Sequence, residues 1–229
     1  MAERHHEKGN ALWLIIIAIF LLGGLTVMLT RSSGTSDETG DFEKTQIKVT
    51  ELMRYANSLA TAVQSLKFNG KCSENEISFD NSTVVGYTNG SAPTDDSCSV
   101  FKVKGGGQTW RSPPEGINDG SQWIITGANK VAGVGCDTAV AGCSELLLLL
   151  PGLTEAACLR VNSLMKTSNP SNAPPNDADS TIDTTLFQGA FSATETISDS
   201  GGALNGKETG CIDSDGSGAN VFYSTLLKR

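Results

Sequence analysis

The residues with the clearest chemical signal are six cysteines, all of which follow residue 70. An even number of cysteines in a domain outside the cytoplasm predicts disulfide bonds. The spacing does not choose among the possible connectivities. Pairing each cysteine with its neighbour in the sequence would give Cys72–Cys98, Cys136–Cys143 and Cys158–Cys211. A metal site is the alternative, but the sequence has no C-x-x-C pair and no histidine near these cysteines.

Nucleophilic and acid–base catalysis find little support in this chain. Its two histidines are His5 and His6, both within the first few residues. Ser-His and Cys-His pairs need an imidazole as the base, and most zinc sites use one as a ligand. The sequence therefore predicts a protein that is not an enzyme and that needs no cofactor.

One acidic stretch has the residue types of a cation site. Asp213 and Asp215 flank Ser214 and precede Gly216, which matches the first half of a calcium-binding loop. The distal bidentate glutamate of such a loop is missing. The alternative is an Asx turn that leads into the last strand of the chain. Asp213 and Asp215 are thus weak calcium candidates, and no metal site is predicted firmly.

The charge of the chain bears on its partners. Lys and Arg number 17 and Asp and Glu number 25, which gives a net charge of −8. A surface of this sign repels the phosphates of DNA and of anionic lipids. We therefore expect no nucleic-acid partner for the outer part of the chain.

A long apolar run begins close to the N-terminus. Residues 11–29 carry no charge over 19 positions. As a helix this run is about 28 Å long, close to the hydrocarbon thickness of a bilayer. A cleaved secretory signal would have a shorter apolar core and a small-x-small cleavage site. The run therefore predicts a retained membrane helix with its N-terminus in the cytoplasm and the cysteines on the outer side.

The junction before this run carries a family resemblance. Lys8-Gly9-Asn10 ends a short charged leader, and the apolar helix follows at once. This layout resembles the prepilin-type signal of type IV pilins and of the pseudopilins of type II secretion. The resemblance implies cleavage after Gly9 by a prepilin peptidase and methylation of the new terminus, Asn10. The family usually has Glu at the fifth mature position, where this chain has Leu14, and that difference favours a minor subunit over a major one.

A second helical segment follows a polar stretch. Residues 32–41 are rich in Ser, Thr, Gly and acids, and predict a linker outside the membrane. Residues 42–69 then have an apolar seam with 3-4-3-4-3 spacing. Its members are Val49, Leu52, Ala56, Leu59, Val63 and Leu66. The seam either packs on the chain's own globular head or forms an assembly contact with sister subunits, and the self-packing alternative is favoured.

The remaining residues, 70–229, predict one α+β head with an antiparallel sheet. The expected strands are 76–80, 83–88, 99–104, 122–127, 184–191 and 220–227. Thr154 is expected to cap a helix, and the leucines at 146–150 are expected to be buried.

These expectations divide the chain in sequence order. The divisions are a leader (1–9), a transmembrane helix (10–31), a polar linker (32–41), an amphipathic stalk helix (42–69) and a disulfide-bonded head (70–229). The predicted function is that of a structural subunit, minor pilin-like or pseudopilin-like, of a filament. Its expected partners are other pilin subunits, the prepilin peptidase and the inner membrane, with the head periplasmic or extracellular. The alternative is an unprocessed periplasmic binding domain on a single membrane anchor.

Overall fold

A computed structural model describes residues 10–135, 143–179, 181–192 and 195–229, with the side chains of residues 10–12 and 29–39 left out. The chain divides into two compact units with a boundary between Lys44 and Thr45. The first unit consists of helix alone over its described residues. The second unit holds the rest of that helix and the whole head.

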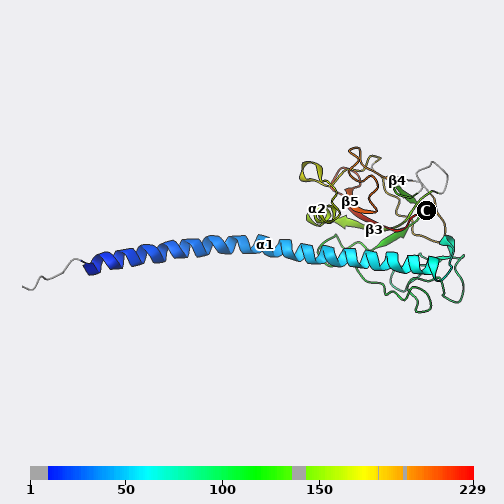
Figure 1. The fold of residues 1–229 in the computed structure, drawn as a ribbon, viewed down its shortest axis with the longest axis horizontal. Helices are drawn as coiled ribbons and strands as arrows, with labels where there is room; N and C mark the ends of the chain where they lie inside the picture. The colour runs from blue at the N-terminus through cyan, green and yellow to red at the C-terminus, as the bar shows by residue number, and fades with distance from the viewer. Residues whose placement is uncertain (1–9, 136–142, 180, 193–194) are drawn as a thin grey trace, which may run out of the picture. The chain divides into compact units, whose positions relative to one another are not determined.

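Helix α1 runs from Asn10 to Phe68 as one element (Figure 1). It therefore includes residues 32–41, where the sequence predicts a break. That segment contains no proline, and Gly, Ser and Thr weaken an α-helix by roughly 1 kcal/mol each or less without blocking its hydrogen bonds. The helix can for this reason continue through the polar stretch.

Within the described side chains, no helix combines the length and the apolar character that crossing a membrane requires.

The head is built on a four-stranded antiparallel sheet in the order β1-β3-β6-β5. The strands are β1 (Ile124–Thr126), β3 (Leu146–Leu153), β6 (Asn220–Leu227) and β5 (Thr209–Asp213). The two long central strands, β3 and β6, pair in register from Leu147 with Thr225 to Leu150 with Phe222. An α+β head with an antiparallel sheet, as the sequence predicts, is therefore confirmed.

The two faces of this sheet belong to different hydrophobic clusters, because alternate strand residues point to opposite sides. Leu148 and Phe222 belong to the larger cluster, together with residues of α1. Figure 1 shows the C-terminal part of α1 along this side of the sheet. Leu149 and Tyr223 belong to a smaller cluster on the other face. The leucine run is thus buried on both faces, as predicted, and every one of its five residues has 0% exposure.

The smaller cluster is covered by a second, two-stranded sheet. Its strands, β2 (Asn129–Val131) and β4 (Glu195–Ile197), pair in parallel. Helix α2 spans Glu155–Leu164, and the hydroxyl of Thr154 accepts a hydrogen bond from the backbone N–H of Ala157 at 3.3 Å, as expected of an N-cap. Two short 3-10 helices, η1 (Glu74–Glu76) and η2 (Pro170–Asn172), complete the described elements.

Several predicted strands are wrong. The strand expected at 220–227 is present with those bounds, and the one expected at 122–127 is β1. Residues 76–104 contain no extended strand, and their backbone pairing is an isolated bridge between Ser78 and Ser99. Residues 184–191 form no strand either. These segments carry strand-type residues but hold their positions by burying single side chains such as Phe79, Tyr87 and Phe187.

Candidate functional site

The first part of α1 exposes a continuous apolar surface. Twelve large hydrophobic side chains between Trp13 and Met28 are solvent-exposed in the isolated chain. Five of them, residues 13–17, are consecutive, and five consecutive positions pass more than once around an α-helix. The apolar surface therefore surrounds the helix and is not restricted to one stripe. A helix that is apolar on all sides needs an apolar surrounding.

The residues predicted for processing lie at the edge of this segment. Asn10 is the first residue of α1, and its side chain is not described. Gly9 lies outside the described residues. Leu14, which stands where the pilin-like pattern has glutamate, is 62% exposed. It adds to the apolar surface and offers no charge to a neighbouring amine.

The seam of the second half of α1 lies in the core of the head. Its six residues, Val49, Leu52, Ala56, Leu59, Val63 and Leu66, are each at most 4% exposed. They share one cluster with residues of β3, β6 and α2. Tyr55 also contacts Trp123 of the head, with ring centroids 5.4 Å apart. The seam therefore packs on the chain's own sheet and is not an exposed assembly surface, which is the self-packing alternative.

A polar contact fixes the same helix near its entry into the head. The ammonium group of Lys48 donates a hydrogen bond to the carbonyl oxygen of Glu115 at 2.6 Å. The hydroxyl of Tyr55 accepts one from the backbone N–H of Arg111 at 3.3 Å. Both bonds join α1 to the loop before β1. This half of α1 is thus held by polar contacts as well as by its buried seam.

Two disulfide bonds are described in full. Cys72 pairs with Cys98 across 26 residues, and Cys158 pairs with Cys211 across 53 residues. Both bonds agree with the neighbour pairing. Cys143 is also disulfide-bonded. Its expected partner, Cys136, lies outside the described residues.

The Cys158–Cys211 bond lies beside an interaction that the sequence does not reveal. The side-chain oxygen of Asn162 accepts a hydrogen bond from the Cys211 backbone N–H at 2.8 Å. Its side-chain nitrogen donates to the Cys211 carbonyl oxygen at 2.9 Å. Strand β5 is at the edge of the sheet, so these two backbone groups would otherwise lack a partner. The buried amide of Asn162 bonds both groups, as a neighbouring strand would at this one position.

The calcium candidates form a turn. One carboxylate oxygen of Asp213 accepts a hydrogen bond from the Gly216 backbone N–H, and the other accepts one from Gly218, both at 3.0 Å. Asp215 accepts bonds from the backbone N–H and the hydroxyl of Ser217. These oxygens thus hold backbone N–H groups in the Asx-turn alternative. No group of three or more metal-ligating side chains occurs in the part of the chain that the structure describes.

A buried acid, Asp177, lies near this turn and was not expected. Its backbone N–H donates to the carbonyl oxygen of Asp213 at 2.8 Å, and one of its carboxylate oxygens accepts from Ser198 at 3.1 Å. The other oxygen is buried without a hydrogen-bond partner. Burial, followed by the neighbouring carboxyl of Asp179, raises the pKa of Asp177 to about 7. No local sequence pattern marks this residue, because its burial depends on loops distant in the chain.

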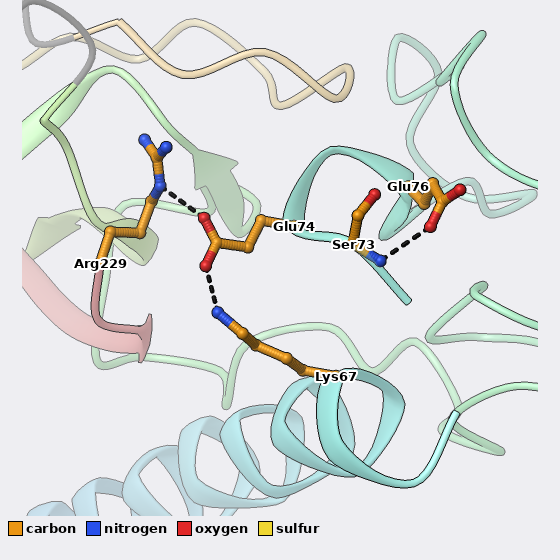
Figure 2. A network of polar contacts seen from close by, with 5 residues as sticks. All are labelled: Lys67, Ser73, Glu74, Glu76 and Arg229. Atoms are coloured by element: carbon orange, nitrogen blue, oxygen red, sulfur yellow. Dashed lines mark hydrogen bonds and ion pairs between the residues drawn. The ribbon is translucent and has the colours of Figure 1, made fainter. Parts of the chain in front are cut away.

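A charged network joins the end of α1 to the end of the chain (Figure 2). Glu74 accepts a short contact from the ammonium group of Lys67, the last basic residue of α1. The other carboxylate oxygen of Glu74 accepts from Nε of Arg229 at 2.7 Å. The Arg229 guanidinium also lies over the ring of Phe191, 4.0 Å from its centroid. Nearby, the backbone N–H of Ser73 donates to Glu76 at 2.7 Å and orders the same short segment.

The two cations set the ionisation of Glu74. Partial burial disfavours its charged form, but the hydrogen bonds from Lys67 and Arg229 outweigh burial and lower the pKa of this carboxyl. A carboxyl with a lowered pKa in the folded state stabilises that state above its unfolded pKa. The contribution is lost as the pH falls through the folded pKa.

We expect Glu74→Gln to lower the unfolding free energy by about 1 kcal/mol at pH 7 and by less near pH 3. The difference should shrink as the pH falls below the usual range of a glutamate. The measurement is thermal unfolding of the detergent-solubilised full chain at both pH values. Glu208→Gln is the control, because it removes an exposed pair with Lys228 and should change little at either pH. An equal effect of Glu74→Gln at both pH values would contradict the lowered pKa of Glu74 in the folded chain.

Comparison with known proteins gives no relative for this arrangement. No family model, curated protein or solved structure matches the chain.

Proposed function

We propose that this chain is a non-enzymatic structural subunit, minor pilin-like or pseudopilin-like, of a filament related to type IV pili or to type II secretion. The observation that carries the proposal is the exposed apolar surface around residues 13–28 of α1. A surface of this kind is stable in lipid or against the apolar helices of other subunits, and unstable in water. The short leader that ends at Gly9 supports the same assignment.

The proposal includes a membrane-bound stage. The uncharged run of residues 11–29 extends beyond the described side chains at both ends and has 19 residues. As a helix it is about 28 Å long, which suits a single passage through a bilayer. We place its N-terminus in the cytoplasm and the head in the periplasm of a bacterium, or outside the cell after assembly. The disulfide bonds support this location, since they persist in oxidising compartments.

In this mechanism the apolar helix first stores the subunit in the inner membrane and then packs among the helices of neighbouring subunits. The head would be presented at the tip or side of the filament. Leu14 favours a minor position, because it has no carboxylate to pair with the amine of a neighbouring Asn10. The seam in the second half of α1 is buried in the chain's own head. In this proposal the N-terminal segment is therefore the part of α1 that contacts other subunits.

A second candidate is a periplasmic binding domain on an unprocessed single-pass anchor. Leu14 favours it too, because a simple anchor has no need of a glutamate at that position. The two candidate functions differ in whether the chain is cleaved after Gly9.

The test is the intact mass and N-terminal sequence of the protein extracted from the membranes of its native host. We expect a chain that starts at Asn10 and carries one extra methyl group. Gly9→Val should block this processing, whereas Gly23→Ala should not, because Gly23 has open space around it. A wild-type chain that still begins at Met1 or Ala2 would overturn the filament proposal and leave the anchored binding domain.

A further inference from the structure

A small hollow on the head has no part in the proposed assembly. It has a volume of about 280 Å³ and is lined by residues 80–83, 101–102 and 108–110. These three segments approach one another because the Cys72–Cys98 bond and the bridge between Ser78 and Ser99 hold the surrounding loops together. The hollow lies wholly within the head.

One part of its lining is aromatic and fixed in place. Phe101 and Trp110 meet edge to face, with centroids 5.4 Å apart, and Trp110 also contacts Tyr87 at 6.2 Å. Both lining rings pack against the core of the head and keep a part of their surface exposed. The indole N–H of Trp110 is buried and has no acceptor in the described part of the chain. Because it is buried, this N–H is not part of the surface of the hollow.

The loop at 80–83 is held by hydrogen bonds of one side chain. The side-chain oxygen of Asn81 accepts hydrogen bonds from the backbone N–H groups of Thr83 and Val84, at 2.9 and 2.8 Å. Its nitrogen donates to the carbonyl oxygen of Phe79 at 3.1 Å. Asn81 therefore uses its hydrogen-bonding capacity to shape the wall and has little left for a ligand.

Other polar groups at the hollow are not used by the fold. The side chains of Asp80, Lys102 and Gln108 form no hydrogen bond or ion pair with the described residues of the chain. Asp80 offers acceptors, Lys102 offers donors, and the Gln108 amide offers both. The carboxylate and the ammonium group have opposite charges, so the lining has no net charge that would select an anion or a cation.

We propose that this hollow binds a saccharide that carries an N-acetyl group. An acetamido group needs an acceptor for its N–H, a donor for its carbonyl oxygen and an apolar contact for its methyl group. Asp80, Gln108 and the Phe101–Trp110 pair supply one of each. The C–H face of a sugar ring also packs well on aromatic rings, and its hydroxyls suit the remaining polar groups. The volume is enough for one sugar ring with its substituents.

The test is saturation-transfer NMR with the full chain in lipid nanodiscs. The probes are N-acetylglucosamine and N-acetylgalactosamine, with glucose as the matched sugar that lacks the acetamido group. We expect the strongest saturation on the acetyl methyl protons of at least one N-acetyl sugar and much weaker saturation on glucose. Asp80→Ala and Gln108→Ala should each weaken binding about tenfold. Neither side chain has a partner in the described fold, so both variants should keep the wild-type Tm.

Glu51→Ala is the control, because it removes an exposed carboxylate of α1 outside the hollow and should leave binding unchanged. The proposal is overturned if neither N-acetyl sugar receives saturation, or if glucose binds equally well. Binding that is unaltered in Asp80→Ala and Gln108→Ala would also overturn it. The proposal does not depend on processing at Gly9, so either proposal can fail alone.

Discussion

Leu59→Ala is expected to lower the unfolding free energy of the head by about 2–5 kcal/mol. Leu59 is fully buried in the cluster that α1 shares with the sheet, and its truncation leaves a cavity next to well-packed side chains. Ile47→Ala, on the same helix, should change the unfolding free energy by no more than about 0.5 kcal/mol. Ile47 is 67% exposed, so its side chain contributes little to the folded chain.

The comparison can be measured by denaturant unfolding of the full chain in mild detergent, followed by tryptophan fluorescence. Trp123 is a suitable reporter, because it is 1% exposed and contacts Tyr55 of α1. The two substitutions test whether the seam packs within the chain or between subunits. If the seam packed between subunits, Leu59→Ala would leave the stability of a dilute monomer unchanged and would weaken association instead. A small effect of Leu59→Ala at low protein concentration would therefore contradict self-packing.

The sequence predicted correctly those elements whose signal lies within a few neighbouring residues. The 3-4 spacing of the seam, the Thr154 cap and the strand at 220–227 are of this kind. In each, local preference and burial favour the same conformation. The predicted break at residues 32–41 depended on composition alone, and composition of this type weakens a helix without ending it.

The strands predicted between residues 76 and 104 show the opposite case. Apolar and β-branched residues there meet the local pattern, but a strand also needs a partner in register. The structure gives these residues one isolated bridge and one disulfide bond, and their side chains fill the core from irregular backbone. Which segments pair depends on the fold of the whole chain, and no short stretch of the sequence reveals it.

The polar contacts of the head were beyond prediction for the same reason. Glu74 and Arg229 are 155 residues apart, and Asn162 and Cys211 are 49 apart. Before the fold is known, Asn162 is an ordinary polar residue of a helix, and Glu74 is an ordinary surface acid. The cysteines were an exception, since covalent chemistry limits their partners to five other positions and the even count indicates that they pair.

Removal of the Cys158–Cys211 bond should cost about 4 kcal/mol, from the loop-closure entropy of its 53-residue separation. We expect this for the double variant Cys158→Ala, Cys211→Ala, which leaves no unpaired thiol and places no hydroxyl in the apolar core. The bond also holds α2 against β5, where Asn162 pairs with the Cys211 backbone. Its loss should therefore loosen that pairing and weaken the protection of the sheet edge.

The matched control is the double variant Cys72→Ala, Cys98→Ala, whose loop of 26 residues predicts a slightly smaller entropic loss of about 3.5 kcal/mol. Hydrogen exchange of the full chain in detergent separates the two effects. In the first variant the backbone amide at position 211, now an alanine, should exchange faster than the Cys211 amide of the second, even when both are compared at equal global stability. If the amide at position 211 keeps its protection without the bond, Asn162 alone holds the edge at that position, and the disulfide acts only on the unfolded chain. If protection falls as expected, the bond and the amide form one unit that closes the sheet at β5.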